Sequence, residues 1–512
     1  MARGASRSGR PIGPADIPSV IGYEIDEAGN VLYDRPFMLD NESRRKHLAS
    51  IAPSGGGKSV LWRTIGLADA ASGDANSIFL DPQGSDIVDR MLEHFAAIAP
   101  TESYIGRLGL IDAGANRISN HNPIFVAPGA DPEPIAMSFL ARIVTAAGVT
   151  GVRWPEHARN IIMALCYSGL DVCPMDVLAF MADAEYRGHV LRAMGDRAPF
   201  VAAHFKNYKE LSPGERLSWD SPVATKVSPL VGTKFLRRLY RPGAPWDVSG
   251  FVDNPPGKIV LCAFRKGVVP KQSAMLASST IMGDIVAAAF ARDAIPESER
   301  RPTYLMIDEA SHFAEDDALR QASVETRKYR LWLGLAAQSI SQIPMDARRE
   351  IVGNMHYILA GRLGSADAYD IVRESGADDP ESVRRRLMRL DAGEMILIEK
   401  GRDPRFVKIN KDPDRRVDKG AVNALRQIAL DNMVAEPVAE IDCRIERRYA
   451  SLLGLSSPTV AAEPSTVKDN DVANVSPVNP QASVAPPPKP AFDVRSSGRN
   501  RSHRRDQGGS HG

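Results

Sequence analysis

The segment Ala52-Pro53-Ser54-Gly55-Gly56-Gly57-Lys58-Ser59 decides the fold of this chain. It follows an apolar stretch at 47–51 and precedes a helical pattern at 60–71, which is the strand, loop and helix order that a phosphate-binding loop requires. Glycines let backbone N–H groups converge on a phosphate, and the N-terminus of the following helix adds positive dipole there. The sequence therefore predicts a nucleotide site on this loop. The alternative is a chance glycine-rich turn.

The chemistry expected of this loop follows from its last residues. Lys58 is predicted to reach the β- and γ-phosphates of ATP, and the Ser59 hydroxyl is predicted to bind Mg²⁺. The first position of the G-x-x-x-x-G-K-[ST] pattern is Ala52, and alanine there is expected to shift the loop slightly. The residues expected to contact the nucleotide are Ala52, Pro53, Ser54, Gly55, Gly56, Gly57, Lys58, Ser59 and Val60.

A second motif, Tyr304-Leu305-Met306-Ile307-Asp308-Glu309-Ala310, is an apolar strand pattern that ends in two acids. Such strand ends form the edge where α/β proteins place their sites. Asp308 suits the Mg²⁺ shell, and Glu309 suits the role of polarising the attacking water. The competing interpretation is a simple N-cap of the next helix.

Two further candidates act near the γ-phosphate. Gln338 follows the apolar run 331–336 and is predicted to sense the nucleotide state, unless it only caps the next helix. Arg327 lies in Arg327-Lys328-Tyr329-Arg330, where an arginine can reach the nucleotide of a neighbouring subunit and raise the rate by roughly 10³- to 10⁵-fold. A solvated or salt-bridged arginine is the competing interpretation.

Apolar runs alternate with helical patterns along most of the chain, which predicts an α/β fold with a mainly parallel sheet and flanking helices. The stretch 131–256 has only helical patterns and is expected to be an inserted all-helical domain. A β-hairpin is predicted at 394–398 and 405–409. The predicted parts are an N-terminal segment 1–45, a core in two pieces 46–130 and 257–412, the insert 131–256, helices at 413–456 and a disordered tail 457–512. The expected strands are 47–51, 77–80, 258–264, 304–307, 331–336 and 357–360.

Composition excludes several other classes. The net charge of +1 indicates no particular partner. The 4 cysteines are too far apart for a metal knuckle, and such sparse cysteines suit a reducing cytosol. No signal peptide is visible, and the apolar segment 274–291 is interrupted by Asp284, so a packed helix is expected there. We expect a cytoplasmic protein without an intrinsic membrane span. The tail is rich in Pro and Ser and ends in a cluster of arginines that can contact phosphates.

Taken together, the motifs resemble the TraG/TraD-like conjugative transfer (type IV secretion) ATPases of the HerA/FtsK class of P-loop ring translocases. The resemblance covers about 47–399, and the order of its short pieces is more specific than any one of them. These pieces are His47, Leu80-Asp81-Pro82-Gln83-Gly84, Asn122-Pro123-Ile124, Arg153-Trp154-Pro155-Glu156, Arg327-Lys328-Tyr329, Ala337-Gln338-Ser339 with Gln342, Gly353-Asn354, and the stretch from Gly361 to Ala368.

The resemblance implies a RecA-like core in which Lys58 and Ser59 bind ATP and Mg²⁺, with Asp308 and Glu309 as the Walker B pair. It also implies hexamers with DNA in a central channel and ATP sites between subunits. Arg327 then matches the trans-acting arginine, and Arg362 is a second candidate for finger or sensor, with a structural salt bridge as the alternative. Coupling proteins usually carry N-terminal transmembrane helices and HerA helicases an N-terminal barrel, and neither pattern precedes the loop here.

The leading interpretation is therefore an ATP-driven translocase of single- or double-stranded DNA, with relaxase, nuclease or secretion-channel partners and peripheral attachment at the inner membrane through such partners. The alternatives are a HerA-like DNA-processing helicase, a secretion ATPase that exports protein without gripping DNA, and an ATP-gated adaptor. Basic residues of the insert are candidates for contact with DNA phosphates. They are Lys206, Lys209, Lys226, Lys234, Arg237 and Arg238.

Overall fold

The computed structural model describes residues 20–39, 45–73, 75–84, 86–97, 105–147, 154–253, 257–410 and 418–452. Its contacts divide the chain into a compact unit, Met1–Pro458, and a second unit, Thr459–Gly512. The predicted disordered tail and its arginines lie outside the described residues, as does Arg153. The predicted division of the first unit into core, insert and C-terminal helices stays a prediction.

An eleven-stranded sheet forms the centre of the first unit, in the order β2-β1-β12-β11-β10-β3-β9-β8-β4-β7-β5. The strands from β10 to β5 pair in parallel, and those from β2 to β11 add on antiparallel, beginning with β11 on β10. The predicted α/β fold with a mainly parallel sheet is confirmed. The strands are β1 (Val20–Ile25), β2 (Val31–Met38), β3 (Leu48–Ile51), β4 (Asn76–Asp81), β5 (Leu108–Asp112), β7 (Ile259–Ala263), β8 (Thr303–Ile307), β9 (Leu331–Ala337), β10 (Tyr357–Ala360), β11 (Glu394–Glu399) and β12 (Arg405–Ile409).

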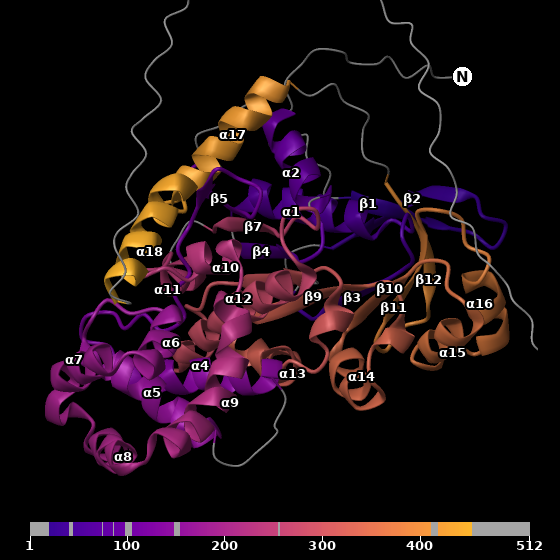
Figure 1. Cartoon of the computed structure of the whole chain (residues 1–512). Helices are drawn as coiled ribbons and strands as arrows, with labels where there is room; N and C mark the ends of the chain where they lie inside the picture. The colour runs from indigo at the N-terminus through magenta and orange to yellow at the C-terminus, as the bar shows by residue number, and fades with distance from the viewer. Residues whose placement is uncertain are drawn as a thin grey trace, which may run out of the picture. The chain divides into compact units, whose positions relative to one another are not determined.

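Helices cover both faces of this sheet, because the parallel strands are apolar on both sides. Side chains of α1 (Lys58–Ser72) and α2 (Asp86–Ala97) share one hydrophobic cluster with one set of strand residues. Side chains of α12 (Lys271–Phe290) and α13 (Asp317–Glu325) share another cluster with the alternate set. Figure 1 shows these two helix pairs on opposite sides of the strands. The result is a three-layer α/β arrangement.

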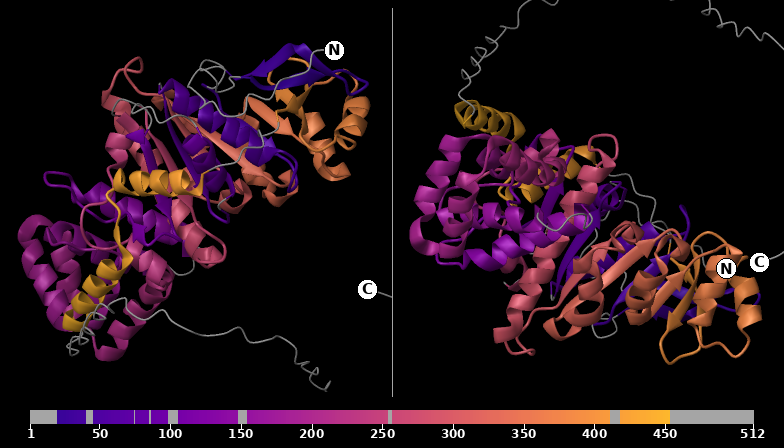
Figure 2. Two further views of the ribbon diagram at one scale, coloured as in Figure 1. Left: turned by 90° about the horizontal axis from the view of Figure 1, so that it is seen from above. Right: turned by 60° about the horizontal axis from the view of Figure 1, so that its bottom comes forward.

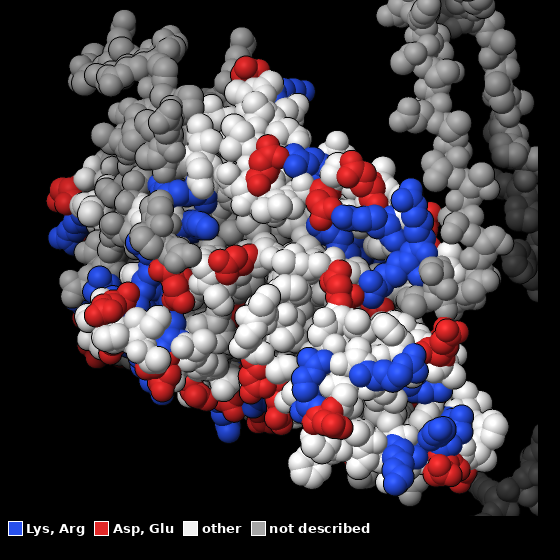
Figure 3. Space-filling model, turned by 90° about the vertical axis from the view of Figure 1, so that its left-hand side faces the viewer, with Lys and Arg blue, Asp and Glu red and all other residues white. Residues whose placement is uncertain are grey.

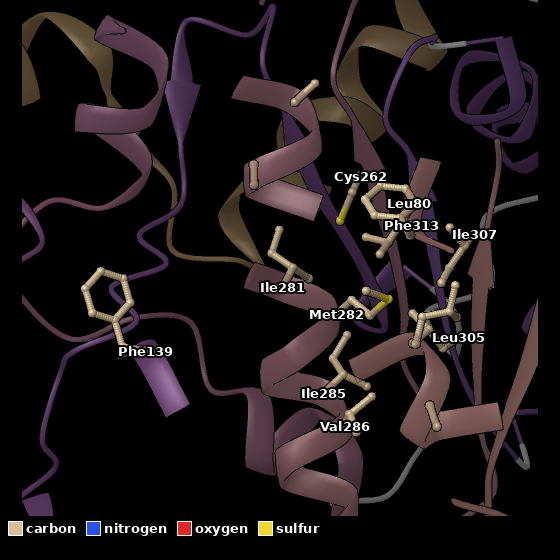
Figure 4. Close-up of a cluster of buried hydrophobic side chains, with 14 of the residues drawn as sticks. Leu80, Phe139, Cys262, Ile281, Met282, Ile285, Val286, Leu305, Ile307 and Phe313 are labelled. Atoms are coloured by element: carbon tan, nitrogen blue, oxygen red, sulfur yellow. The ribbon is translucent and has the colours of Figure 1, made fainter. Parts of the chain in front are cut away.

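The helix α12 corresponds to the apolar segment for which the sequence predicts a packed helix. The stretch Lys271–Ala294 is long and apolar enough to cross a membrane, since an 18-residue window in it has a mean hydropathy of 1.6, but 61% of that window is buried inside the structure. Figure 4 shows Ile281, Met282 and Ile285 of α12 beside Leu305 and Ile307 of β8. Its apolar side chains are therefore used in the packing of the sheet.

Between β5 and β7 the described chain is helical apart from the two-residue strand β6 (Arg117–Ile118), which pairs with β13 (Glu436–Pro437). Figure 1 shows these helices gathered below and to the left of the sheet. The helices are α4 (Pro132–Ala147), α5 (Trp154–Ser168), α6 (Met175–Ala182), α7 (Ala184–Met194), α8 (Pro199–Glu210), α9 (Pro213–Val231), α10 (Lys234–Leu239) and α11 (Val248–Asp253), with a 3-10 turn η2 (Gly195–Arg197).

The remaining short elements connect or flank the last strands. The helices are α14 (Met345–Ile351), α15 (Ser365–Arg373), α16 (Pro380–Leu387), α17 (Lys419–Asp431) and α18 (Val438–Leu452). The 3-10 turns are η3 (Ala291–Ala294), η4 (Ala310–Phe313), η5 (Thr326–Tyr329), η6 (Ile340–Gln342) and η7 (Val352–Asn354).

The last two helices, drawn in gold in Figure 2, connect the sheet with the helical insert. On α17, Arg426 pairs with Asp89 of α2 at 2.7 Å and with the buried Asp112 at the end of β5. On α18, Asp442 accepts two hydrogen bonds from Arg238 of α10, at 2.7 and 2.6 Å. Ion pairs at both ends therefore hold this pair of helices across the two regions.

Candidate functional site

The glycine-rich loop leaves the carboxyl end of β3 and enters α1 at Lys58. Gly55 and Gly57 have φ angles of +77° and +100°, a region that side chains disfavour. Gly56 has no such angle, but a Cβ there would lie 2.7 Å from the Cβ of Ala52. Ala52 itself is buried and has no positive φ, which explains why alanine fits where the pattern has glycine. The backbone conformation at Gly55 and Gly57 and the close contact at Gly56 thus account for the three glycines of the loop.

The first turn of α1 carries the two polar residues of the loop motif. Lys58 is 8% exposed and its Nζ donates to the Ala52 carbonyl and, at 3.4 Å, to the Pro53 carbonyl. Burial lowers the pKa of this ammonium, and the nearby carboxylates of Asp308 and Glu309 oppose that shift. Ser59 is partly buried beside it. The structure therefore brings the loop lysine and the two strand-end acids into one electrostatic site.

Two aspartates of adjacent parallel strands face this site. Asp308 follows β8, Asp81 ends β4, and the Asp308 N–H donates to the Leu80 carbonyl at 2.9 Å. Burial and the neighbouring Glu309 raise the pKa of Asp308 to about 6. Burial and the charge of Asp308 raise the pKa of Asp81 to about 7, although hydrogen bonds from the N–H groups of Gln83 and Gly84 act to lower it. Carboxylate and hydroxyl oxygens are ligands that Mg²⁺ accepts, so Asp308 and Ser59 fit a bound Mg²⁺.

Sequence reasoning gave Asp81 no role, although it appears among the resembling motifs. The signal was present, because Asp81 ends an apolar strand run in the same way as Asp308. Since the carboxyl ends of parallel strands meet at one edge, two such acids on neighbouring strands are brought together. The adjacency of β4 and β8 is what the sequence did not provide.

Glu309 and Gln338 are in direct contact across the ends of β8 and β9. The Gln338 Nε2 donates to Glu309 Oε1 at 2.5 Å. Glu309 has a left-handed backbone, with φ of 50°, and its side chain makes no hydrogen bond that caps η4. The cap of η6 is Ser339. The two capping alternatives are therefore wrong for these residues. Left-handed backbone is costly for a residue with a Cβ and is often found at functional sites.

The two candidate arginines lie at opposite edges of the sheet. Arg362 follows β10, and the Gly361 N–H donates to the Ile51 carbonyl at 2.9 Å, so Arg362 is at the edge that carries the loop. Arg327 precedes β9, and its guanidinium donates to the Asn354 carbonyl at 2.6 Å. Both side chains are exposed. Because β9 has seven residues at about 3.3 Å each, roughly 20 Å separates Arg327 from the loop of its own chain.

The buried Asp81 leads to a testable effect of pH on stability. Its folded pKa of about 7 lies above the ordinary aspartate value of 3.8, so its stabilising contribution is present below about pH 4 and is lost as pH rises through 7. We expect Asp81→Asn to equal the wild type at pH 4 and to be more stable by about 2–4 kcal/mol at pH 8. The measurement is urea unfolding with EDTA and without nucleotide. Asp34→Asn, at an exposed position of β2, is the control. An equal difference at both pH values would contradict this account of Asp81.

The six basic candidates of the helical insert differ in their surroundings. Lys206 and Lys209 are exposed on α8. Arg237 donates to the Val231 carbonyl at 2.8 Å, and Lys226 lies 5.0 Å from the centre of the Trp154 ring. Arg238 is occupied by its two hydrogen bonds to Asp442. Lys234, the first residue of α10, is exposed as well. Of this set, Lys206, Lys209 and Lys234 are the better candidates for an outside anion.

No protein-family model matches the sequence, and no curated protein does. Solved structures do match. The plasmid coupling protein TrwB in complex with the non-hydrolysable GTP analogue GDPNP aligns with a TM-score of 0.52 and 14% identity, over 77% of this chain and 91% of that chain. The chain has the fold of a conjugative coupling protein. TrwB in complex with ADP and Mg²⁺ aligns with a TM-score of 0.50 and 14% identity, over 77% and 91%. VirB4 of Thermoanaerobacter pseudethanolicus aligns with a TM-score of 0.51 and 15% identity, over 80% and 98%. The predicted RecA-like P-loop fold is thereby confirmed.

Proposed function

We propose that this chain is an ATPase that hydrolyses ATP with Mg²⁺ at the loop after β3. The observation that carries the proposal is the convergence of four strand ends. Lys58 follows β3, and Asp81 is the last residue of β4. Asp308 follows β8, and Gln338 follows β9 and contacts Glu309. Solved structures of TrwB with ADP and Mg²⁺ and with GDPNP share this fold.

Each residue has a role that its position supports. The loop N–H groups and Lys58 hold the β- and γ-phosphates, and Ser59 and Asp308 hold Mg²⁺, which when bound neutralises phosphate charge. Glu309 orients the attacking water and accepts its proton. Gln338 already contacts Glu309 and can therefore report the state of the γ-phosphate to β9. Arg362 lies at the same edge, which supports a role as a sensor within its own subunit.

We further propose that copies of the chain assemble as a hexameric ring that moves DNA, as the coupling-protein motor of conjugative transfer or type IV secretion. Arg327 supports a head-to-tail assembly, because it lies at the edge opposite its own site and can serve only the nucleotide of a neighbour. TrwB, which shares this fold, is described as a plasmid coupling protein and a bacterial conjugative coupling protein, and this supports a role in conjugation. Relaxase, nuclease or secretion-channel partners are then expected, with attachment at the cytoplasmic side of the inner membrane through them.

The DNA grip requires cations facing the phosphates, and these need only a local stripe. Figure 3 shows Lys and Arg mixed with Asp and Glu over the face that includes the insert. Lys206 and Lys209 of α8 and Lys234 of α10 remain exposed candidates within the insert. A ring that grips DNA through such scattered cations should bind more weakly as salt rises.

The test is ATP hydrolysis by the purified chain with and without single- and double-stranded DNA, at two salt concentrations. Stimulation by DNA that falls with salt supports the translocase. Unwinding of duplex ends together with stimulation points to a HerA-like helicase. Hydrolysis that ignores DNA favours the protein-export motor, and nucleotide binding without turnover favours the ATP-gated adaptor.

A further inference from the structure

Cations gather along the edge of the sheet that lies opposite the nucleotide site. This edge holds the beginnings of β3, β8, β9 and β10 and the end of the antiparallel strand β11. Basic residues immediately precede or follow these strands. They are Arg45, Lys46, Arg300, Arg301, Arg327, Lys328, Arg330 and Lys400.

The centre of this basic edge is a pair of cations on one short turn. Arg327 donates to the Asn354 carbonyl at 2.6 Å, and the Lys400 Nζ donates to the carbonyl of the adjacent Gly353. Beside them, the Lys46 Nζ donates to His356 Nε2 at 2.9 Å. Arg327 and Lys400 are both exposed. Two positive head groups are therefore held side by side by neutral acceptors at the surface.

The nearby carboxylates belong to other cations. Glu399 pairs with Arg402 at 3.1 Å and with Arg405 at 3.5 Å, and Glu374 pairs with Arg373 at 3.6 Å. Within the described part of the chain, no ion pair joins a carboxylate to Arg327, Lys400 or Lys46. Arg327 and Lys400 bind the carbonyls of adjacent residues, so their like charges repel, and an anion bound between them would relieve this repulsion. The arrangement is thus that of an anion receptor.

We propose that Arg327, Lys400 and Lys46 form a second phosphoryl-binding site, at the edge of the sheet opposite the glycine-rich loop. Planar guanidinium and flexible ammonium groups together suit the tetrahedral oxygens of phosphate. The electrostatics agree with this geometry. Burial and the charge of Arg327 lower the pKa of Lys400, and Glu374 acts in the opposite direction. Burial and the charges of Lys46 and Arg327 lower the pKa of His356, and Glu399 acts in the opposite direction.

The nucleotide of the same chain cannot supply this phosphoryl group, because its loop lies at the other end of the strands. The nucleotide held by a second copy can, and this assignment rests on the proposed function. Lys400 and Lys46 then contact the nucleotide of the neighbouring copy together with Arg327. The binding of a phosphoryl group at the site does not itself depend on hydrolysis, so the two claims can be tested separately.

The first experiment tests whether Lys400 acts on a neighbour. Lys400→Ala keeps its own loop and Glu309, and Glu309→Gln keeps its own Lys400. We expect each variant alone to hydrolyse ATP more slowly, about 10- to 100-fold for Lys400→Ala. An equal mixture should exceed the mean of the two, because the intact site of one chain meets the intact Lys400 of the other. A mixture whose hydrolysis rate equals the mean overturns the assignment to the neighbour's nucleotide. If Lys400→Ala binds DNA more weakly and the mixture does not recover hydrolysis, the assignment is also overturned, and the site belongs to a nucleic acid backbone.

The second experiment tests the site without hydrolysis. Tripolyphosphate is titrated by calorimetry into Lys58→Ala protein, whose own loop is disabled. Adding Lys400→Ala should lower the remaining affinity at least about tenfold, and adding Arg402→Ala should not, since Arg402 is a neighbouring cation that already pairs with Glu399. Equal affinity in the three proteins overturns the site even if the wild type hydrolyses ATP. A selective loss supports the site even if the wild type is inactive, in which case only the proposed function fails.

Discussion

Lys58→Ala is expected to lower the affinity for Mg²⁺-ATP at least about a hundredfold, because two charge-assisted hydrogen bonds to the phosphates are lost at once. Turnover should fall below detection at ordinary ATP concentrations. The physical basis is the position of Lys58 in the first turn of α1, where it is 8% exposed and directed at the carbonyls of its own loop. The measurement is the binding of a fluorescent ATP analogue, followed by hydrolysis at saturating protein.

A loss of fold is separated from a loss of binding by thermal unfolding without nucleotide, which should change by only a few degrees. The matched control is Lys266→Ala, which removes an exposed cation from the same edge of the sheet, just after β7. Lys266→Ala should bind nucleotide like the wild type. If Lys58→Ala retained wild-type affinity, the glycine-rich loop would not be the nucleotide site.

Much of the fold was predictable because each central strand is buried on both faces. Runs such as Tyr304 to Ile307 are continuously apolar, and their alternation with helical patterns indicates parallel strands and crossovers. The strand β5, Leu108–Asp112, was missed, although all of its residues are buried. Its pairing with β7, which the sequence does not show, makes it a strand of this sheet. The antiparallel strands β1 and β2 likewise depend on the distant strand β12.

The candidate site was predictable to the extent that it lies at strand ends. A P-loop lysine and acids after a strand are local patterns, so Lys58, Asp308 and Glu309 were found without knowing strand order. The hydrogen bond between Gln338 and Glu309 needed β8 and β9 to be neighbours, which is a tertiary fact. The two arginines could have been separated from the sequence, because Arg327 precedes its predicted strand and Arg362 follows one. Parallel strands place these positions at opposite edges.

The carboxylate of Glu309 provides the second large expected effect, and it separates chemistry from binding. Glu309→Gln keeps the side-chain shape and an amide oxygen that can still accept from Gln338 Nε2. It removes the group that takes the proton of the attacking water, so ATP hydrolysis should fall about 10²- to 10⁴-fold. Binding of Mg²⁺-ATP should stay within about threefold, because Lys58, Ser59 and Asp308 are unchanged.

Single-turnover hydrolysis and nucleotide affinity are measured together, with Glu315→Gln, at an exposed acid after η4, as the control. If Glu309→Gln hydrolysed ATP at the wild-type rate, Glu309 would be a structural partner of Gln338 and the water would have to be activated by another group. If affinity fell with the rate, the contact between Glu309 and Gln338 would be holding the nucleotide pocket in shape.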